Sequence, residues 1–183
     1  MTADSDNAPA TGQKGTHKKA GKTAPKAKMT GRSTARLLAV QAVYQIEMTG
    51  ITVDRAMSEF IQHRLEAPGE EGEGFAPADR STFVAVVGGV ERDRSALDEM
   101  ISGALDPSWP IDRLESVLLA ILRCGAWELR SRPEVPTRAV ISEYIDIAHA
   151  FYGGREPALV NGVLDKLARV LRPQAGPKDG SSA

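Results

Sequence analysis

Apolar side chains recur every three or four residues along most of this chain, a spacing typical of helices with one buried face. Turn residues separate the periodic stretches, and no alternating β-branched run bounded by hairpin turns occurs among them. The first predicted helix starts at Ser33 or Thr34 and ends at Gly50, and the next spans 53–65. The others are a long helix, straight or bent, over 77–101, followed by helices over 112–130, 137–152 and 157–171. The pattern predicts an all-α fold, a compact bundle of about six to seven helices.

Two of these helices are apolar around most of their circumference, the first and the one over 112–130, which is expected at the centre of the fold. Within the central helix, Arg123 is expected to be a partly buried structural arginine with a carboxylate partner. The single cysteine, Cys124, should be a small buried apolar residue. Gly88 and Gly89 cost helix propensity, so another helix is expected to pack closely against them.

Both ends of the chain lack the large apolar side chains that would offset the entropy of ordering. We therefore expect a disordered Lys-rich tail over 1–30, a helical domain over 31–172 and a disordered tail over 173–183. Charge is divided in the same way. Residues 1–36 hold eight Lys or Arg against two Asp, and the rest of the chain holds fifteen against twenty-two acidic residues. A basic arm thus precedes an acidic body.

Catalytic and cofactor motifs are missing from the sequence: it has no phosphate-binding loop, no dinucleotide fingerprint and no paired cysteines for zinc. The three histidines, His17, His63 and His149, are scattered over the tail and two helices, which disfavours a metal site. We expect no cofactor, no metal and no enzymatic activity. No apolar run approaches the roughly 18 to 20 residues of a membrane span, and no secretory signal is present, so the protein is expected to be cytoplasmic and not to bind membranes.

The positive signal is electrostatic, because the lysines of the tail, including Lys26 and Lys28, lead directly into Arg32 and Arg36. These two arginines are four residues apart, so they share one face at the start of the first helix. Helix N-termini favour phosphate, and basic side chains in a flexible arm neutralise a nucleic-acid backbone. A solubilising tail with two solvated arginines is the simpler interpretation. The residues alone leave RNA binding and a helical protein-interaction module equally open.

A second candidate surface is the corner over 151–157, where two aromatic residues precede Gly153, Gly154 and Arg155. Aromatic rings and a guanidinium can stack an unpaired base and hold its phosphate, which is how single-stranded RNA is usually recognised. Phe151 lies on the apolar arc of its helix and is expected to point inward. Arg155 is therefore the better candidate for RNA contact.

An ordered set of short motifs resembles the NusB family of transcription antitermination factors over about residues 32–172. The set comprises Ala35-Arg36, Ala39-Val40-Gln41-Ala42-Val43-Tyr44, Ile121-Leu122-Arg123, Glu128-Leu129, Val135-Pro136 and Val160-Asn161-Gly162-Val163-Leu164-Asp165-Lys166. The resemblance implies two three-helix halves that bind boxA in nascent ribosomal RNA together with NusE, a small-subunit ribosomal protein. It also implies that the protein works in the transcription elongation complex and helps RNA polymerase to read through terminators.

By position, the resemblance assigns RNA contact to Arg32 and Arg36 and to Gly154, Arg155 and Leu159 at the corner between the last two helices. The sequence departs from the family at Leu118 and Leu119, where charged residues are common. Together with Tyr44, these leucines are expected to form an apolar surface for NusE or for a homodimer. The alternative function is a helical scaffold or homodimeric module that does not bind RNA sequence-specifically.

Overall fold

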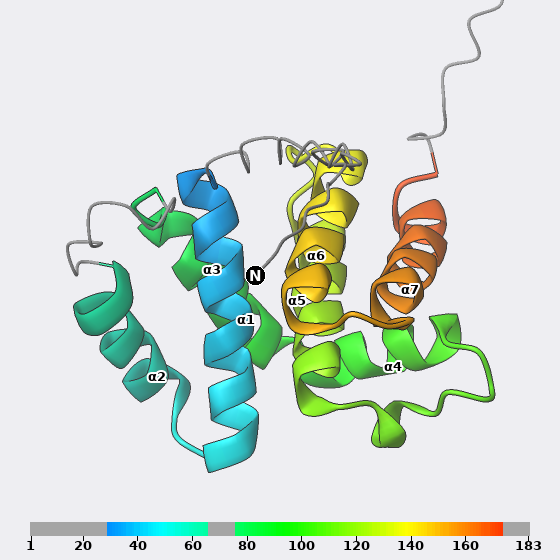
Figure 1. Cartoon of the computed structure of the whole chain (residues 1–183), viewed down its shortest axis with the longest axis horizontal. Helices are drawn as coiled ribbons and strands as arrows, with labels where there is room; N and C mark the ends of the chain where they lie inside the picture. Colours follow the sequence, from blue (N-terminus) through cyan, green and yellow to red (C-terminus); the bar gives the residue numbers. More distant parts are fainter. Residues whose placement is uncertain (1–28, 66–75, 174–183) are drawn as a thin grey trace, which may run out of the picture.

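The computed structural model describes residues 29–65 and 76–173, and its regular elements in these ranges are helices joined by short loops (Figure 1). Its elements are α1 (Gly31–Thr49), α2 (Val53–Phe60), α3 (Arg80–Arg92), α4 (Arg94–Ala104), α5 (Ser116–Ser131), α6 (Thr137–Phe151) and α7 (Glu156–Leu171). A π-helical turn (Ile61–Leu65) extends α2, and a 3-10 turn (Ile111–Arg113) precedes α5. The predicted all-α fold is confirmed. Lys26 and Lys28 lie outside the described residues, as does most of both predicted tails.

The helices form two groups that meet at α5. Figure 1 shows α1, α2 and α3 on one side, α5, α6 and α7 on the other, and α4 crossing beneath α5 and α7. Helix α5 packs against α1, α3, α4, α6 and α7. Eleven of the twelve residues of α5 from Leu118 to Leu129 are buried, which confirms that α5 lies at the centre of the fold as predicted.

Helix α1 begins earlier than its sequence pattern predicts. The N-cap is Thr30, whose side chain accepts a hydrogen bond from the Ser33 amide, in place of Ser33 or Thr34. The backbone of this start is paired with the segment before α3. Ala76 donates to the Met29 carbonyl at 3.2 Å and Asp79 donates to the Gly31 carbonyl at 2.9 Å. These long-range bonds hold the chain from Met29 onward, ahead of the predicted boundary at residue 31.

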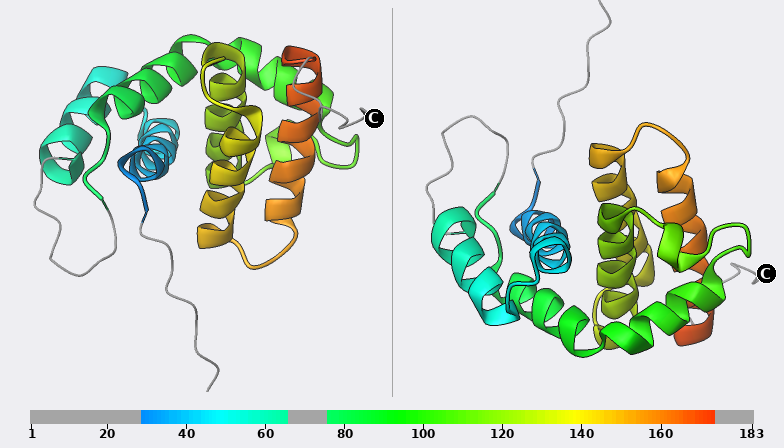
Figure 2. Two further views of the ribbon diagram at one scale, coloured as in Figure 1. Left: turned by 90° about the horizontal axis from the view of Figure 1, so that it is seen from above. Right: turned by 90° about the horizontal axis from the view of Figure 1, so that it is seen from below.

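The predicted long helix over 77–101 is two helices that meet at Asp93. Helix α3 ends with the Asp93 amide donating to Gly89, and α4 starts in a new direction with Leu97 donating back to the Asp93 carbonyl. Figure 2 shows the two helices as an arch around the other elements. The apolar spacing continues through the joint, so the change of direction leaves no mark on the periodic pattern.

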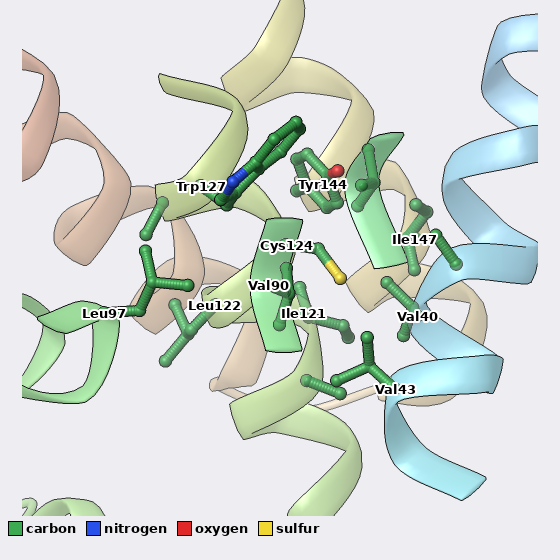
Figure 3. Packing of buried hydrophobic residues seen from close by; sticks show 14 of the residues in the cluster. Val40, Val43, Val90, Leu97, Ile121, Leu122, Cys124, Trp127, Tyr144 and Ile147 are labelled. Carbon is green, nitrogen blue, oxygen red and sulfur yellow. The ribbon is translucent and has the colours of Figure 1, made fainter. Parts of the chain in front are cut away.

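Close packing between α3 and α5 explains one of the two adjacent glycines. A Cβ atom built on Gly89 would lie 2.0 Å from Cε2 of the Trp127 indole, whereas one built on Gly88 would meet nothing within 4 Å. The expectation of a close helix contact is therefore confirmed at Gly89 and wrong at Gly88. Figure 3 shows Trp127 at one edge of the buried cluster, with Cys124 inside it. Complete burial raises the pKa of the Cys124 thiol, in line with the predicted apolar role.

Two arginines bind elements together. Arg123 of α5 is buried and donates to Asp98 of α4 at 2.7 and 2.9 Å and to Glu47 of α1 at 3.0 Å, as predicted for a structural arginine. Arg172, which follows α7, donates to four carbonyls at the end of α5 and beyond it, those of Glu128, Leu129, Arg132 and Val135. Of these, the Leu129 carbonyl belongs to the last turn of α5, where carbonyl groups lack intrahelical partners, whereas the Glu128 and Arg132 carbonyls also accept backbone amides. In the described ranges, no helix has the length and apolarity needed to cross a membrane.

Candidate nucleic-acid interface

Arg32 lies in the first turn of α1 and is exposed to solvent. The N-terminus of α3 is beside it, because Asp79, the N-cap of α3, donates its amide to the Gly31 carbonyl. Hydrogen bonds from Thr82 and Ser81, with a smaller contribution from the charge of Arg32, lower the pKa of the Asp79 carboxyl to about 2. That carboxylate is occupied with capping α3. Within the described part of the chain, Arg32 has no hydrogen-bonding carboxylate partner, so its guanidinium is available to an anion.

Arg36 does not share this exposed position, and the expectation that it is exposed is wrong. Its residue surface is only 4 % exposed. Its Nε and Nη2 atoms donate to the two carboxylate oxygens of Glu128 at 2.9 and 2.6 Å, and its Nη1 atom lies 3.6 Å from Glu143. Side chains four residues apart on a helix point in directions that differ by about 40°. This difference is enough to place Arg32 on the solvent-exposed face of α1 and Arg36 on the face that packs against the core.

The ion pair of Arg36 belongs to a larger polar cluster between α1, α5 and α6. Tyr144 donates its hydroxyl to Glu128 at 3.0 Å, and Ser33 donates its hydroxyl to Glu143 at 2.8 Å. Burial opposes the charge of Arg36, but the hydrogen bonds and charge of Glu128 outweigh it and raise the guanidinium pKa. Burial raises the pKa of Tyr144, and the negative charge of Glu128 adds to the effect. Arg36 is therefore positively charged and Tyr144 neutral in the folded protein.

The corner between α6 and α7 presents a mixed aromatic and basic surface. Phe151 is 43 % exposed, so the expectation that it points inward is wrong. It is the last residue of α6, where the apolar arc runs past the elements that cover it. Gly154 and Arg155 are exposed, and Leu159 on the first turns of α7 is half-buried. The corner therefore offers a ring face and a guanidinium close together in sequence, and the Glu156 carboxylate lies against the Gly154 backbone.

Tyr152, the second aromatic residue of the corner, is directed toward the protein. It is half-buried and donates its hydroxyl to Glu115 at 3.2 Å. Burial and the neighbouring Glu115 carboxylate raise the pKa of Tyr152 to about 12. Of the two aromatic residues, Phe151 is thus the one available for stacking. In the sequence, the position of Phe151 on the apolar arc of its helix instead predicts that its ring is buried.

The predicted protein-binding surface is only partly present. Tyr44 of α1 is exposed, and Leu119 of α5 is half-buried at the edge of the core. Leu118 is 2 % exposed, so its assignment to a surface is wrong, because five helices cover α5. Met48, one turn after Tyr44, is 56 % exposed and was not singled out by sequence reasoning. Tyr44 and Met48 form an apolar strip on the C-terminal half of α1.

In residues 29–65 and 76–173, no three His, Cys, Asp or Glu side chains are grouped as metal ligands. The surfaces that remain are the exposed start of α1, the α6–α7 corner and the apolar strip of α1. All three suit a macromolecular partner better than a small molecule, because they lie at helix ends or along a helix face and small-molecule sites are typically concave.

Comparison with known proteins gives one consistent family. The NusB family model matches residues 33–169. A Brucella ovis protein named transcription antitermination protein NusB is 49 % identical over 146 residues, which cover 79 % of this chain and 84 % of that protein. Among solved structures, T. maritima NusB has a TM-score of 0.63 at 24 % identity and covers 78 % of this chain and 92 % of its own. A complex described as the antitermination factors NusB and NusE with dsRNA has a TM-score of 0.61 at 21 % identity, covering 76 % of this chain and 97 % of that one.

Proposed function

The chain belongs to the NusB family, and we propose that it recognises boxA in nascent ribosomal RNA together with NusE, so that RNA polymerase reads through terminators. The family consists of transcription antitermination factors and not of enzymes. The matched region includes all seven helices except the first two residues of α1 and the last two of α7. The proposal concerns which RNA and which partners this member binds.

The observation that carries the proposal is the exposed guanidinium of Arg32 beside the N-termini of α1 and α3. The dipole of α1 favours phosphate at its N-terminus, whereas the N-terminus of α3 already carries the Asp79 carboxylate, and arginine binds phosphate through two parallel bonds. A NusB of the same fold has been solved in a complex with NusE and dsRNA. We assign the first contact with RNA to Arg32 and not to Arg36, whose guanidinium is bound to Glu128.

The α6–α7 corner supplies the second contact in this proposal. Phe151 can stack an unpaired base and Arg155 can hold a phosphate, with the exposed Gly154 between them in sequence and the Glu156 carboxylate against that glycine. Leu159, half-buried on α7, adds an apolar contact. The basic tail, with Lys26 and Lys28 nearest to Arg32 in sequence, adds electrostatic affinity without base selection.

We assign NusE to the apolar strip formed by Tyr44 and Met48, and we retain the half-buried Leu119 of α5 as a further candidate contact. An exposed aromatic residue and methionine are typical of interface centres. Assembly on RNA with NusE would then recruit the protein to the transcription elongation complex. The same strip also favours the second candidate function, a helical module that binds only protein, as a NusE partner or as a homodimer.

Electrophoretic mobility shift of the full chain on boxA RNA and on a scrambled RNA of equal length tests the proposal, with and without NusE. The proposal predicts a shift at lower protein concentration for boxA, and a further gain when NusE is added. Equal binding of both RNAs under all conditions would reject boxA recognition. NusE binding measured by calorimetry, in the absence of any RNA shift, would select the protein-only module.

A further inference from the structure

A polar cluster lies where the two groups of helices meet. It contains side chains from three helices: Ser33 and Arg36 from α1, Glu128 from α5, and Glu143 and Tyr144 from α6. Glu128 and Tyr144 are completely buried. Buried charges are rarely the most stabilising choice, since apolar side chains of similar volume often give equal or greater stability. Their hydrogen bonds have a fixed direction, however, and can specify one arrangement of the helices.

The hydroxyl groups at the start of α1 have a determined direction. Ser33 has one hydroxyl proton and donates it to Glu143, so the 2.8 Å contact between the Ser33 and Thr30 hydroxyls requires Thr30 to donate. Thr30 is also the N-cap and accepts from the Ser33 amide. The capping residue of α1 is therefore linked through Ser33 to a carboxylate on α6.

The first turn of α1 is held from two sides. On one side, the Met29 and Gly31 carbonyls accept backbone hydrogen bonds from Ala76 and Asp79. On the other side, Glu143 accepts from Ser33 and lies near Arg36. Arg32 lies between these anchors in sequence and projects into solvent. The orientation of its backbone, relative to α6, thus depends on the bond between Ser33 and Glu143.

We propose that Glu143 and Ser33 are positioning residues for RNA binding, which set the first turn of α1 against α6 so that Arg32 and the α6–α7 corner meet one RNA together. The inference rests on the proposed function. Glu143 is only 28 % exposed, and it contacts neither RNA nor NusE in this proposal. Its effect on RNA passes through the placement of Arg32.

The test compares Glu143→Ala with Asp146→Ala, which removes the same charge from another site on the same helix. Glu143→Ala is expected to weaken boxA affinity roughly fivefold, as for the loss of one hydrogen bond, whereas Asp146→Ala leaves it unchanged. Glu143→Gln keeps an oxygen that accepts from Ser33 and should restore most of the affinity. Urea unfolding of each variant separates a local effect from a loss of fold.

A double-mutant cycle with Arg32→Ala identifies the path of the effect. If Glu143 acts through Arg32, the double variant loses clearly less affinity than the product of the two single losses. Multiplicative losses, or a Glu143→Ala variant that binds as the Asp146→Ala control does, would overturn the inference.

Amide hydrogen exchange at Ser33 and Thr34 supplies a measurement without RNA. Both amides bond to Thr30, so the inference predicts faster exchange in Glu143→Ala and unchanged exchange in Asp146→Ala. Unchanged exchange in both variants overturns the positioning role, whatever the wild type binds. If the wild type does not select boxA but exchange is faster in Glu143→Ala, the proposed function is rejected. The structural role of Glu143 in fixing the first turn of α1 is then still supported.

Discussion

Arg36 of α1 and Glu128 of α5, 92 residues apart in the chain, form an ion pair through two hydrogen bonds inside the protein. The pair joins the helix that starts the first group to the helix at the centre of the fold. It also separates the roles of two arginines that look alike in the sequence. Arg36 serves the fold, and Arg32 is left at the surface.

Replacing Arg36 with Ala should destabilise the protein by roughly 3 to 5 kcal/mol, because it leaves the completely buried Glu128 without its counter-charge. The free energy of unfolding in urea measures this loss. A paired replacement, Arg36→Met with Glu128→Leu, removes both charges and should cost much less than Arg36→Ala. Equal losses in both variants would show that packing, and not the uncompensated charge, dominates at this site.

The adjacent glycines of α3 should respond in opposite ways to alanine. Gly89→Ala forces a methyl group into the Trp127 indole and should lower the free energy of unfolding by about 1 to 3 kcal/mol, the usual range for overpacking. Gly88→Ala meets no neighbour and should raise stability by up to about 1 kcal/mol through helix propensity. Thermal unfolding of the two variants provides the comparison. A similar change in both would contradict the packing seen at Trp127.

The helices could be predicted from the sequence because burial of one helix face leaves a periodic mark. The start of α6 at Thr137 and the end of α1 at Gly50, which has a φ of 67°, were predicted at the observed residues. The joint at Asp93 and the start at Thr30 were not. Both depend on a change of chain direction or on backbone bonds to distant segments, which apolar periodicity does not record.

The candidate site was predicted less completely, because exposure depends on which helices cover which faces. Arg123 was correctly expected to have a carboxylate partner, since it lies in a helix that is apolar nearly all round. Arg36 lies at the start of a helix in a basic stretch, and nothing local indicates Glu128 as its partner. Phe151 and Leu118 show the same limit in opposite directions, as one is more exposed than expected and the other more buried.

Asp79 should make stability depend on pH in the acid range. Its folded pKa of about 2 is below its usual value of 3.8, so it stabilises the fold above about pH 4, and this contribution disappears as the pH falls toward about 2. Asp79→Asn retains an oxygen that can cap α3 but has no charge to lose. Urea midpoints across this range should therefore converge for wild type and Asp79→Asn as the pH decreases. A constant difference between them would exclude the ionised cap.

The basic tail should contribute affinity without selectivity. Deleting residues 1–28 retains Met29, whose carbonyl bonds to Ala76, and removes six lysines. Binding to boxA and to scrambled RNA should weaken alike. The salt dependence should also flatten, by about 0.7 in slope for each single-strand phosphate that the tail no longer neutralises. Titrations at several salt concentrations measure both quantities. Loss of boxA preference at unchanged affinity would assign selectivity to the tail instead.

RNA recognition at the start of α1 is best tested by the boxA affinity of Arg32→Ala beside Arg55→Ala, a matched loss of an exposed arginine on α2. We expect Arg32→Ala to lose roughly 1 to 3 kcal/mol of boxA affinity if Arg32 reads a base, and less if it meets only phosphate, with the urea midpoint unchanged. Arg55→Ala should bind boxA as the wild type does. Equal affinities for the two variants, or a fall in the urea midpoint of Arg32→Ala that accounts for its whole loss, would contradict RNA recognition by Arg32.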